Sequence, residues 1–327
     1  MRAPGFWYAR PGMASALLTP LSWLWRAGGA LQGGSPWAAP VPVLCVGNLV
    51  AGGTGKTPVV RDLVERLRAR GVAAASLSRG HGGRLTGPVA VDPARHGAGD
   101  VGDEPLLLAG HHPAWIGRDR VAGARAMAAA GAGAIIMDDG FQNPSLRKDL
   151  SLVVVDGGTG FGNGRVIPAG PLREPLTAGL SRADALVVIG EGGGLAAARA
   201  VAEGLPVLTA RLVPDASVAA GLRGRAVLAF AGIGRPEKFF ATLRDVGARV
   251  VEQVAFADHH PFTPTQFLAL IGRAERMGAI PVTTEKDAMR LTPDWRERVI
   301  ILPVRLSWDD PAMVERLLDR LMGVPHG

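Results

Sequence analysis

From residue 41 onward, short apolar runs alternate with longer stretches that are rich in alanine and arginine. The apolar runs are short and continuous rather than alternating, which indicates strands that are buried on both faces. Strands of that kind, separated by helices, are typical of parallel sheets with crossover connections. The runs cover residues 42–46, 73–77, 134–137, 152–155, 185–189 and 206–210. The pattern predicts a doubly wound α/β fold with a mostly parallel sheet.

The pattern changes after residue 212. Residues 213–225 are predicted to be a linker, and a second set of apolar runs follows, with helical stretches between them. These runs cover residues 226–231, 249–254, 280–283 and 299–304. In residues 311–322, leucines alternate with charged side chains, as in an amphipathic surface helix. We therefore expect a larger domain over residues 39–212, a smaller C-terminal α/β lobe over residues 213–327, and a cleft between them.

The first 38 residues differ in composition from the larger domain and from the smaller lobe. They hold six of the 17 aromatic side chains and no carboxylate. Thr19 and Pro20 suit the N-cap and first position of a helix, whose apolar face would carry Leu17, Leu21, Leu24 and Trp25. Pro20 and Arg26 interrupt the apolar run, so neither a secretory signal nor a membrane-spanning helix fits. Residues 1–38 are thus expected to form an amphipathic N-terminal helix.

Charge is distributed unevenly along the chain of 327 residues. The net charge is +7, and the first 61 residues contain five basic side chains and no acidic one, so the rest of the chain is nearly neutral. A basic, tryptophan-rich end suits an anionic membrane surface. The alternative is a helix that packs on the protein's own core. No basic cluster with interleaved aromatic residues follows, so no nucleic acid partner is expected, and no protein partner is evident.

Cysteine usage is minimal. Cys45 is the one cysteine, which excludes a disulfide framework and a multi-cysteine metal site. The expected compartment is the cytoplasm.

The strongest chemical signal is a glycine-rich loop at the end of the first predicted strand, over residues 46–58. Backbone N–H groups of such a loop surround phosphate oxygens, the lysine reaches the β and γ phosphates, and the following threonine can ligate Mg²⁺. A strict phosphate-loop spacing would place glycine at position 50, where this chain has valine. The alternative is a loop that only closes a strand–helix turn. The residues predicted to bind nucleotide are Val50, Ala51, Gly52, Gly53, Thr54, Gly55, Lys56 and Thr57.

Two carboxylates, Asp138 and Asp139, follow the third apolar run. An acid at the end of a strand beside a phosphate loop commonly holds Mg²⁺, directly or through water. An Asp-Gly turn is the alternative, but it accounts only for Asp139. The pair therefore predicts a magnesium site.

Several residues could serve as a base for phosphoryl transfer to a hydroxyl. The candidates are Asp103 or Glu104, and His259 or His260. A guanine-specific pattern fails at residues 284–287, because Lys286 and Asp287 are adjacent. A metal site at residues 258–260 lacks obvious further ligands.

Taken together, these motifs resemble one family, the tetraacyldisaccharide 4′-kinases, which phosphorylate a lipid A precursor at the cytoplasmic face of the bacterial inner membrane. The resemblance runs nearly end to end through nine motifs. They lie at residues 46–58, 78–80, 102–105, 138–142, 161–164, 168–174, 230–234, 258–259 and 284–288.

The resemblance implies a role for each matching residue. Residues 52–57 would bind ATP, and Mg²⁺ would be held by Thr57, Glu104 and Asp138 or Asp139. Asp103, assisted by His259 from the smaller lobe, would act as base on the 4′-hydroxyl of a tetraacyldisaccharide 1-phosphate, and the product would be lipid IVA. Closure of the lobes would assemble this site. Arg79, Asn163 and Arg173 would bind the substrates.

Two positions depart from the family pattern. His81 stands where tyrosine is expected, and Asn143 stands where histidine is expected. Neither removes a proposed catalytic group, although Asn143 cannot titrate. Two other functions stay open at this point: a nucleotide-switched membrane regulator that transfers no phosphate, and a soluble small-molecule kinase whose N-terminal helix is packed on the core.

Overall fold

The structure is a computed structural model that describes residues 4–30, 35–202 and 204–324, with backbone alone for residues 24–30. A nine-stranded sheet has the order β13-β8-β7-β6-β1-β5-β2-β4-β3. It is parallel except at the pairs β13–β8 and β3–β4. Its strands are β1 (Val43–Gly47), β2 (Ala74–Ser78), β3 (Val89–Ala90), β4 (Ala114–Ile116), β5 (Ala134–Asp138), β6 (Leu150–Asp156), β7 (Ala185–Ile189), β8 (Val207–Pro214) and β13 (Val304–Trp308).

Helices cover both faces of this sheet, and the buried strands contribute apolar side chains to two cores. One core is formed with α2, α4 and α13, and the other with α5 and α7. The helical elements of this lobe are η1 (Gly5–Trp7), α1 (Met13–Ala30), α2 (Lys56–Ala69), α3 (Ala98–Val101), α4 (Asp103–Ala109), α5 (Arg120–Ala129), α6 (Leu176–Leu180), α7 (Gly193–Val201) and α13 (Pro311–Met322). The predicted doubly wound, mostly parallel architecture is confirmed.

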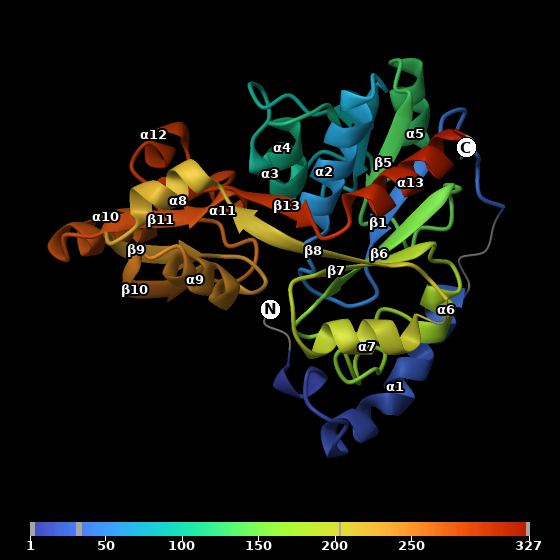
Figure 1. Ribbon diagram of the computed structural model, residues 1–327, viewed down its shortest axis with the longest axis horizontal. Helices are drawn as coiled ribbons and strands as arrows, with labels where there is room; N and C mark the ends of the chain where they lie inside the picture. The colour runs from blue at the N-terminus through green and yellow to red at the C-terminus, as the bar shows by residue number, and fades with distance from the viewer. Residues whose placement is uncertain (1–3, 31–34, 203, 325–327) are drawn as a thin grey trace.

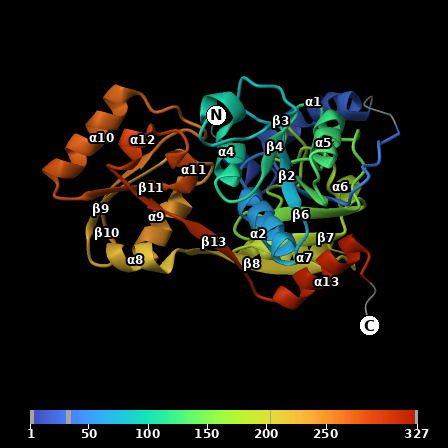
Figure 2. The same cartoon turned by 90° about the horizontal axis from the view of Figure 1, so that it is seen from above.

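A four-stranded parallel sheet, in the order β10-β9-β11-β12, forms the smaller lobe. Figure 1 shows this lobe on the left, joined to the larger one by β8 and β13, and Figure 2 shows the same division from above. Its strands are β9 (Ala226–Ala231), β10 (Arg249–Ala255), β11 (Ile280–Thr284) and β12 (Ile300–Leu302). Its helices are α8 (Ala216–Leu222), α9 (Pro236–Asp245), α10 (Pro264–Arg276), α11 (Glu285–Ala288) and α12 (Pro293–Arg296).

The lobe boundaries differ from the sequence prediction at the C-terminal end. The smaller lobe was expected to extend over residues 213–327, but β13 pairs with β8 in the large sheet and α13 packs on the core of the large lobe. The run predicted as one strand at residues 299–304 is divided at Pro303, so that β12 and β13 belong to different sheets. The predicted linker at residues 213–225 contains the end of β8 and all of α8.

The prediction for the start of the N-terminal helix is wrong. Helix α1 begins at Met13, six residues before Thr19, and Pro20 lies inside it. Ser15 instead caps the helix start, where its hydroxyl accepts from the Gly12 N–H at 3.1 Å. Thr19 donates its hydroxyl to the Ser15 carbonyl at 2.8 Å. Thr19 directly precedes the proline, whose ring removes a helical N–H donor.

Leu318 provides a test that α13 belongs to the large lobe, because its side chain is fully buried in that core. Leu318→Ala should lower the free energy of unfolding of the large lobe by about 2–5 kcal/mol, through lost burial and the cavity that remains. Urea unfolding measures the change. Arg316→Ala, on the exposed face of the same helix, should change it by less than about 0.5 kcal/mol. Equal effects of the two substitutions would contradict the packing of α13.

Candidate active site

The glycine-rich loop connects β1 to α2 at the point where the strand order reverses, with β5 on one side of β1 and β6 on the other. Ligands of doubly wound folds bind at such switch points. Gly52 and Gly55 have φ values of 120° and 89°, which glycine adopts without strain. The buried Asn48 amide donates to the Gly52 carbonyl at 3.2 Å and to Thr54 Oγ1 at 3.3 Å. The loop is thereby held in a fixed conformation ahead of Lys56, the first residue of α2.

Val50, the residue that departs from the phosphate-loop spacing, has a structural explanation. It is buried and forms an antiparallel bridge with Leu172, and the next N–H, from Ala51, donates to the Pro171 carbonyl at 2.8 Å. Its φ is not positive, so the position does not require glycine.

Asp138 and Asp139, at the end of β5, have different surroundings. Val46 of β1 is in register with Asp138, which places this carboxylate beside the glycine-rich loop. Burial raises the pKa of Asp138 to about 7, and the nearby charge of Glu104 adds to the effect. Asp139 instead pairs with Arg173 through bonds of 3.0 and 3.2 Å and lies 3.6 Å from the Lys56 ammonium. These cations outweigh burial and hold the pKa of Asp139 below its usual range.

A divalent cation fits the surroundings of Asp138. Burial and Glu104 both disfavour the charged form of that carboxylate, and a bound Mg²⁺ would relieve both effects. Within the described residues, no group of three or more His, Cys, Asp or Glu side chains converges as a metal site. Phosphate-bound Mg²⁺ needs only one or two protein carboxylates, because nucleotide oxygens and water supply the other ligands.

Asp103 and His259 meet across the two lobes. His259 Nδ1 lies 3.0 Å from both carboxylate oxygens of Asp103, which is 4% exposed in the first turn of α4. Burial would raise the pKa of Asp103, but the His259 hydrogen bond and the Lys286 charge outweigh it and hold that pKa below its usual value. The same bond raises the pKa of His259, against the opposing effect of burial. The sequence-based pairing of these two residues therefore has a direct geometric counterpart.

The backbone around this pair is sterically constrained. Gly102, the N-cap of α4, has a φ of 92°, and a Cβ there would lie 2.5 Å from the His81 carbonyl oxygen. His259 itself has a φ of 57°, which is uncommon for a non-glycine residue. Such conformations persist where the surrounding structure fixes them and are frequent at functional sites.

Lys286 links the dyad to the carboxylates and was not among the predicted site residues. Its ammonium donates to Glu104 at 3.0 Å and Asp258 at 3.5 Å, and lies 3.3 Å from His259 Nε2. Burial would lower the pKa of Lys286, but the surrounding carboxylates, Glu104 foremost, raise it. The scarcity of lysine in this arginine-rich chain is the sequence signal that could have identified it.

Two buried arginines were also missed. The Arg290 Nε atom lies 3.6 Å from an Asp103 oxygen, and its guanidinium is fixed by Asp287 at 2.5 Å. Arg120 is buried at the start of α5, and the charge of Asp138 opposes the lowering of its pKa by burial. Neither residue lies in a motif with a recognisable catalytic spacing.

The three predicted substrate-binding residues lie in three different surroundings. Arg173 joins the carboxylate cluster through Asp139, as described above. Arg79 is exposed and lies directly after β2, at the same carboxyl end of the sheet as Asp138 and Asp139. The Asn163 amide donates to the carbonyls of Phe6 and Ala169, at 3.3 and 3.0 Å. Its side chain thus connects its own loop to the N-terminal segment.

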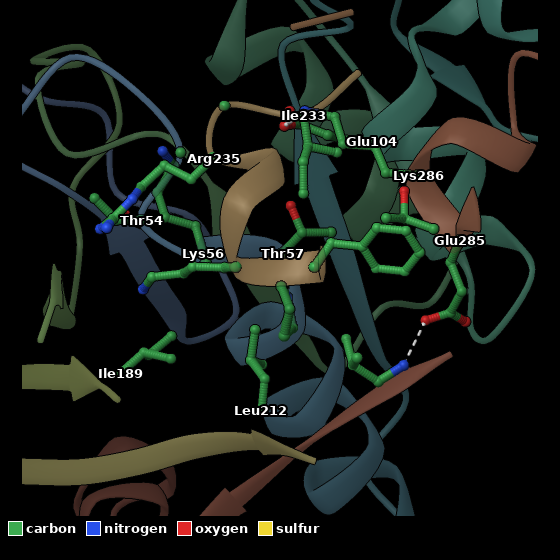
Figure 3. Close-up of a pocket in the computed structure, with 18 of the residues that line it drawn as sticks. Thr54, Lys56, Thr57, Glu104, Ile189, Leu212, Ile233, Arg235, Glu285 and Lys286 are labelled. Atoms are coloured by element: carbon green, nitrogen blue, oxygen red, sulfur yellow. Dashed lines mark hydrogen bonds and ion pairs between the residues drawn. The ribbon is translucent and has the colours of Figure 1, made fainter. Parts of the chain in front are cut away.

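A cavity of about 270 Å³ lies between the lobes at the glycine-rich loop. Figure 3 shows Lys56 and Thr57 from the large lobe opposite Ile233 and Lys286 from the small lobe. The apolar side chains of Ile189 and Leu212 line another part of the same cavity. This combination of a phosphate-binding loop and an apolar wall suits a nucleotide.

The fold and this site define a phosphate-loop phosphotransferase, with a carboxylate–histidine pair beside the nucleotide cavity. Residues 14–322 match the family described as tetraacyldisaccharide-1-P 4′-kinase. A tetraacyldisaccharide 4′-kinase of Rhodospirillum centenum is 60% identical over 98% of this chain and 97% of that protein. One of Rhodospirillum rubrum is 54% identical over 98% of both. The chain belongs to the tetraacyldisaccharide 4′-kinase family.

A solved structure agrees with this assignment. The crystal structure of LpxK from Aquifex aeolicus in complex with ATP superposes with a TM-score of 0.74 at 27% identity, over 94% of this chain and 99% of that one. The family and ATP as the nucleotide agree with the resemblance found in the sequence motifs.

Proposed function

We infer that the protein transfers the γ-phosphoryl group of ATP to the 4′-hydroxyl of a tetraacyldisaccharide 1-phosphate lipid, which yields lipid IVA in lipid A biosynthesis. The observation that carries this proposal is the Asp103–His259 pair, 3.0 Å apart, held beside the glycine-rich loop by contact between the lobes. A regulator that only switches with nucleotide has no need for a buried base at this position. The family relationship likewise supports the kinase.

The residues divide the chemistry among them. Asp103 accepts the proton of the attacking hydroxyl, and His259 orients that carboxylate and shares the proton. Lys56, at the start of α2, stabilises charge on the transferred phosphoryl group. Thr57, Glu104 and Asp138 would hold Mg²⁺, which neutralises charge on the β and γ phosphate oxygens when bound. Arg173 positions Asp139 beside Lys56.

A second cavity, of about 760 Å³, is proposed to receive the acceptor sugar. Asp103 and His259 line this cavity, whereas the neighbouring Glu104 lines the nucleotide cavity. Consecutive residues of α4 therefore face the two cavities, which suits a base that lies between donor and acceptor. Arg79, exposed at the same sheet edge, is a candidate to bind the acceptor phosphate.

Lipid phosphorylation in detergent micelles tests the proposal. With ATP and Mg²⁺, the purified protein should convert a disaccharide 1-phosphate lipid to a bisphosphorylated product, detected by mass spectrometry. Slow ATP hydrolysis with no lipid product would support the nucleotide-switched regulator instead.

We also propose that α1 lies in the interface at the cytoplasmic face of the inner membrane. Among the described residues, no helix is long and apolar enough to cross a membrane. The amphipathic pattern of α1 is inverted relative to a core helix: Ser15 and Ser22 are buried, whereas Met13 and Leu17 are 84% and 79% exposed. Apolar surface turned to solvent is expected of a helix that enters a lipid interface. Leu24 and Trp25, also predicted on this face, belong to the part of α1 for which the backbone alone is described.

Substitutions at exposed apolar positions of α1 test membrane binding. Replacing Leu17, Leu21 and Trp23 with serine should weaken binding to anionic vesicles by about tenfold or more, because less apolar surface enters the interface. Vesicle co-sedimentation measures the change. These substitutions are preferable to deletion of residues 1–31, which would also remove the Phe6 carbonyl that binds Asn163. Leu268→Ser, at a 55% exposed position on α10, is the matched control. Unchanged vesicle binding of the triple variant would contradict the interfacial role of α1.

A further inference from the structure

Two further cations, Arg235 and Lys238 of the small lobe, face the nucleotide cavity. Arg235 is the N-cap residue of α9 and Lys238 lies in the first turn of that helix. Both side chains line the cavity that also contains Lys56 and Thr57. Figure 3 shows Arg235 on the same side of this cavity as Lys56.

The turn that carries these cations lies against the glycine-rich loop. A Cβ added to Gly234 would stand 3.3 Å from the Gly53 nitrogen, so the two backbones are in close contact. Arg235 follows Gly234 directly. The cations are therefore held at the part of the cavity where the phosphates of a nucleotide would bind.

Asp156, at the end of β6, holds both cations. Its Oδ1 atom accepts from Arg235 at 2.6 Å and from the Gly158 N–H at 2.9 Å, and its Oδ2 atom pairs with the Lys238 ammonium. Asp156 is 5% exposed, whereas the Arg235 and Lys238 side chains are 39% and 45% exposed. Within the described part of the chain, Asp156 is the one carboxylate paired with either cation.

We propose that Arg235 and Lys238 bind the triphosphate of the nucleotide, and that Asp156 holds them ready for it. Arginine and lysine each carry several N–H donors, so one carboxylate leaves most of those donors available to phosphate oxygens. The cation of the glycine-rich loop, Lys56, lies 3.6 Å from Asp139 and is partly neutralised. Two further cations from the opposite lobe would balance the charge of a triphosphate that spans the cavity.

A purely structural role for this cluster predicts something different. If the three residues only tied the lobes together, loss of Asp156 and loss of the cations would weaken ATP binding equally. If the cations bind phosphate, loss of the Asp156 charge should leave ATP affinity unchanged or higher, because both cations remain and a repulsive charge is removed. Asp156→Asn retains the Oδ1 atom that accepts from Gly158 N–H, so it changes the charge with little change in shape.

Calorimetric titration of the full-length protein with ATP and Mg²⁺, without lipid, separates the two roles. Arg235→Ala and Lys238→Ala should each weaken ATP binding by about tenfold, as expected for the loss of a charge-assisted hydrogen bond. Arg235→Lys should restore much of the loss. In steady-state assays the KM for ATP should rise by a similar factor, while the KM for the lipid stays within about twofold of the unsubstituted enzyme.

Arg244→Ala, at an exposed position in the last turn of the same helix, is the matched control and should leave ATP affinity unchanged. Thermal unfolding without nucleotide establishes that each variant is folded. Unchanged ATP affinity in the Arg235→Ala/Lys238→Ala double variant would overturn the proposal. Equal weakening by Asp156→Asn and by the double variant would overturn it as well, because the cluster would then act only as a tie between lobes.

Discussion

Lys56→Ala is expected to lower kcat by about 10³-fold. The ammonium lies at the start of α2, where the helix dipole and the loop N–H groups also favour negative charge, and its stabilisation increases as charge develops on the transferred phosphoryl group. Single-turnover measurements with saturating ATP report this step directly. Arg70→Ala, at the far end of the same helix, should keep turnover near that of the unsubstituted enzyme.

The division between kcat and KM decides what Lys56 does. A rise in the KM for ATP with unchanged kcat would mean that the lysine binds the ground state and the transition state equally, and its proposed role in the transition state would be wrong.

Asp103→Ala should lower kcat by about 10²-fold or more, the usual contribution of a general base. Asp103 does not line the nucleotide cavity, so the affinity for ATP should change little. The KM for ATP and the turnover number for the lipid are the two measurements. His259→Ala should have a smaller effect than Asp103→Ala, because it removes the partner of the base and not the base itself.

The control for this substitution lies three residues away. Asp100 is also a carboxylate near the start of a short helix, but it pairs with the exposed Arg84. Asp100→Ala should leave turnover near normal. Near-normal turnover of Asp103→Ala would remove Asp103 from the mechanism.

The central strands could be predicted from the sequence to within about two residues, because strands that are buried on both faces form continuous apolar runs. The strands β3 and β4 have two and three residues, which is too short for such a pattern. An apolar run predicts a strand but does not indicate which of the two sheets that strand joins. Nothing local indicates that β13 returns to the large sheet, because its partner β8 lies about 90 residues earlier in the sequence.

In the candidate site, too, residues placed by the local sequence could be predicted, whereas residues placed by contacts between distant segments could not. Asp138 ends β5, and Lys56 and Thr57 begin the helix that follows β1, so their positions at one end of the sheet could be predicted from sequence spacing. Lys286, Arg290 and Arg235 reach the site from the small lobe through contacts that no spacing records. Asn163 belongs to a recognisable motif, yet its amide binds backbone carbonyls, a role that a motif alone does not specify.

The antiparallel pairing of β13 with β8 extends from Val304–Pro214 to Trp308–Ala210. The chain enters the small lobe along β8 and leaves it along β13, so the two lobes are joined by a two-stranded ribbon. A ribbon of this kind bends out of its plane more easily than within it, because in-plane bending would stretch one strand and compress the other. Motion of the small lobe would bend this ribbon, and it would move His259 and Arg235 together, because both residues belong to that lobe.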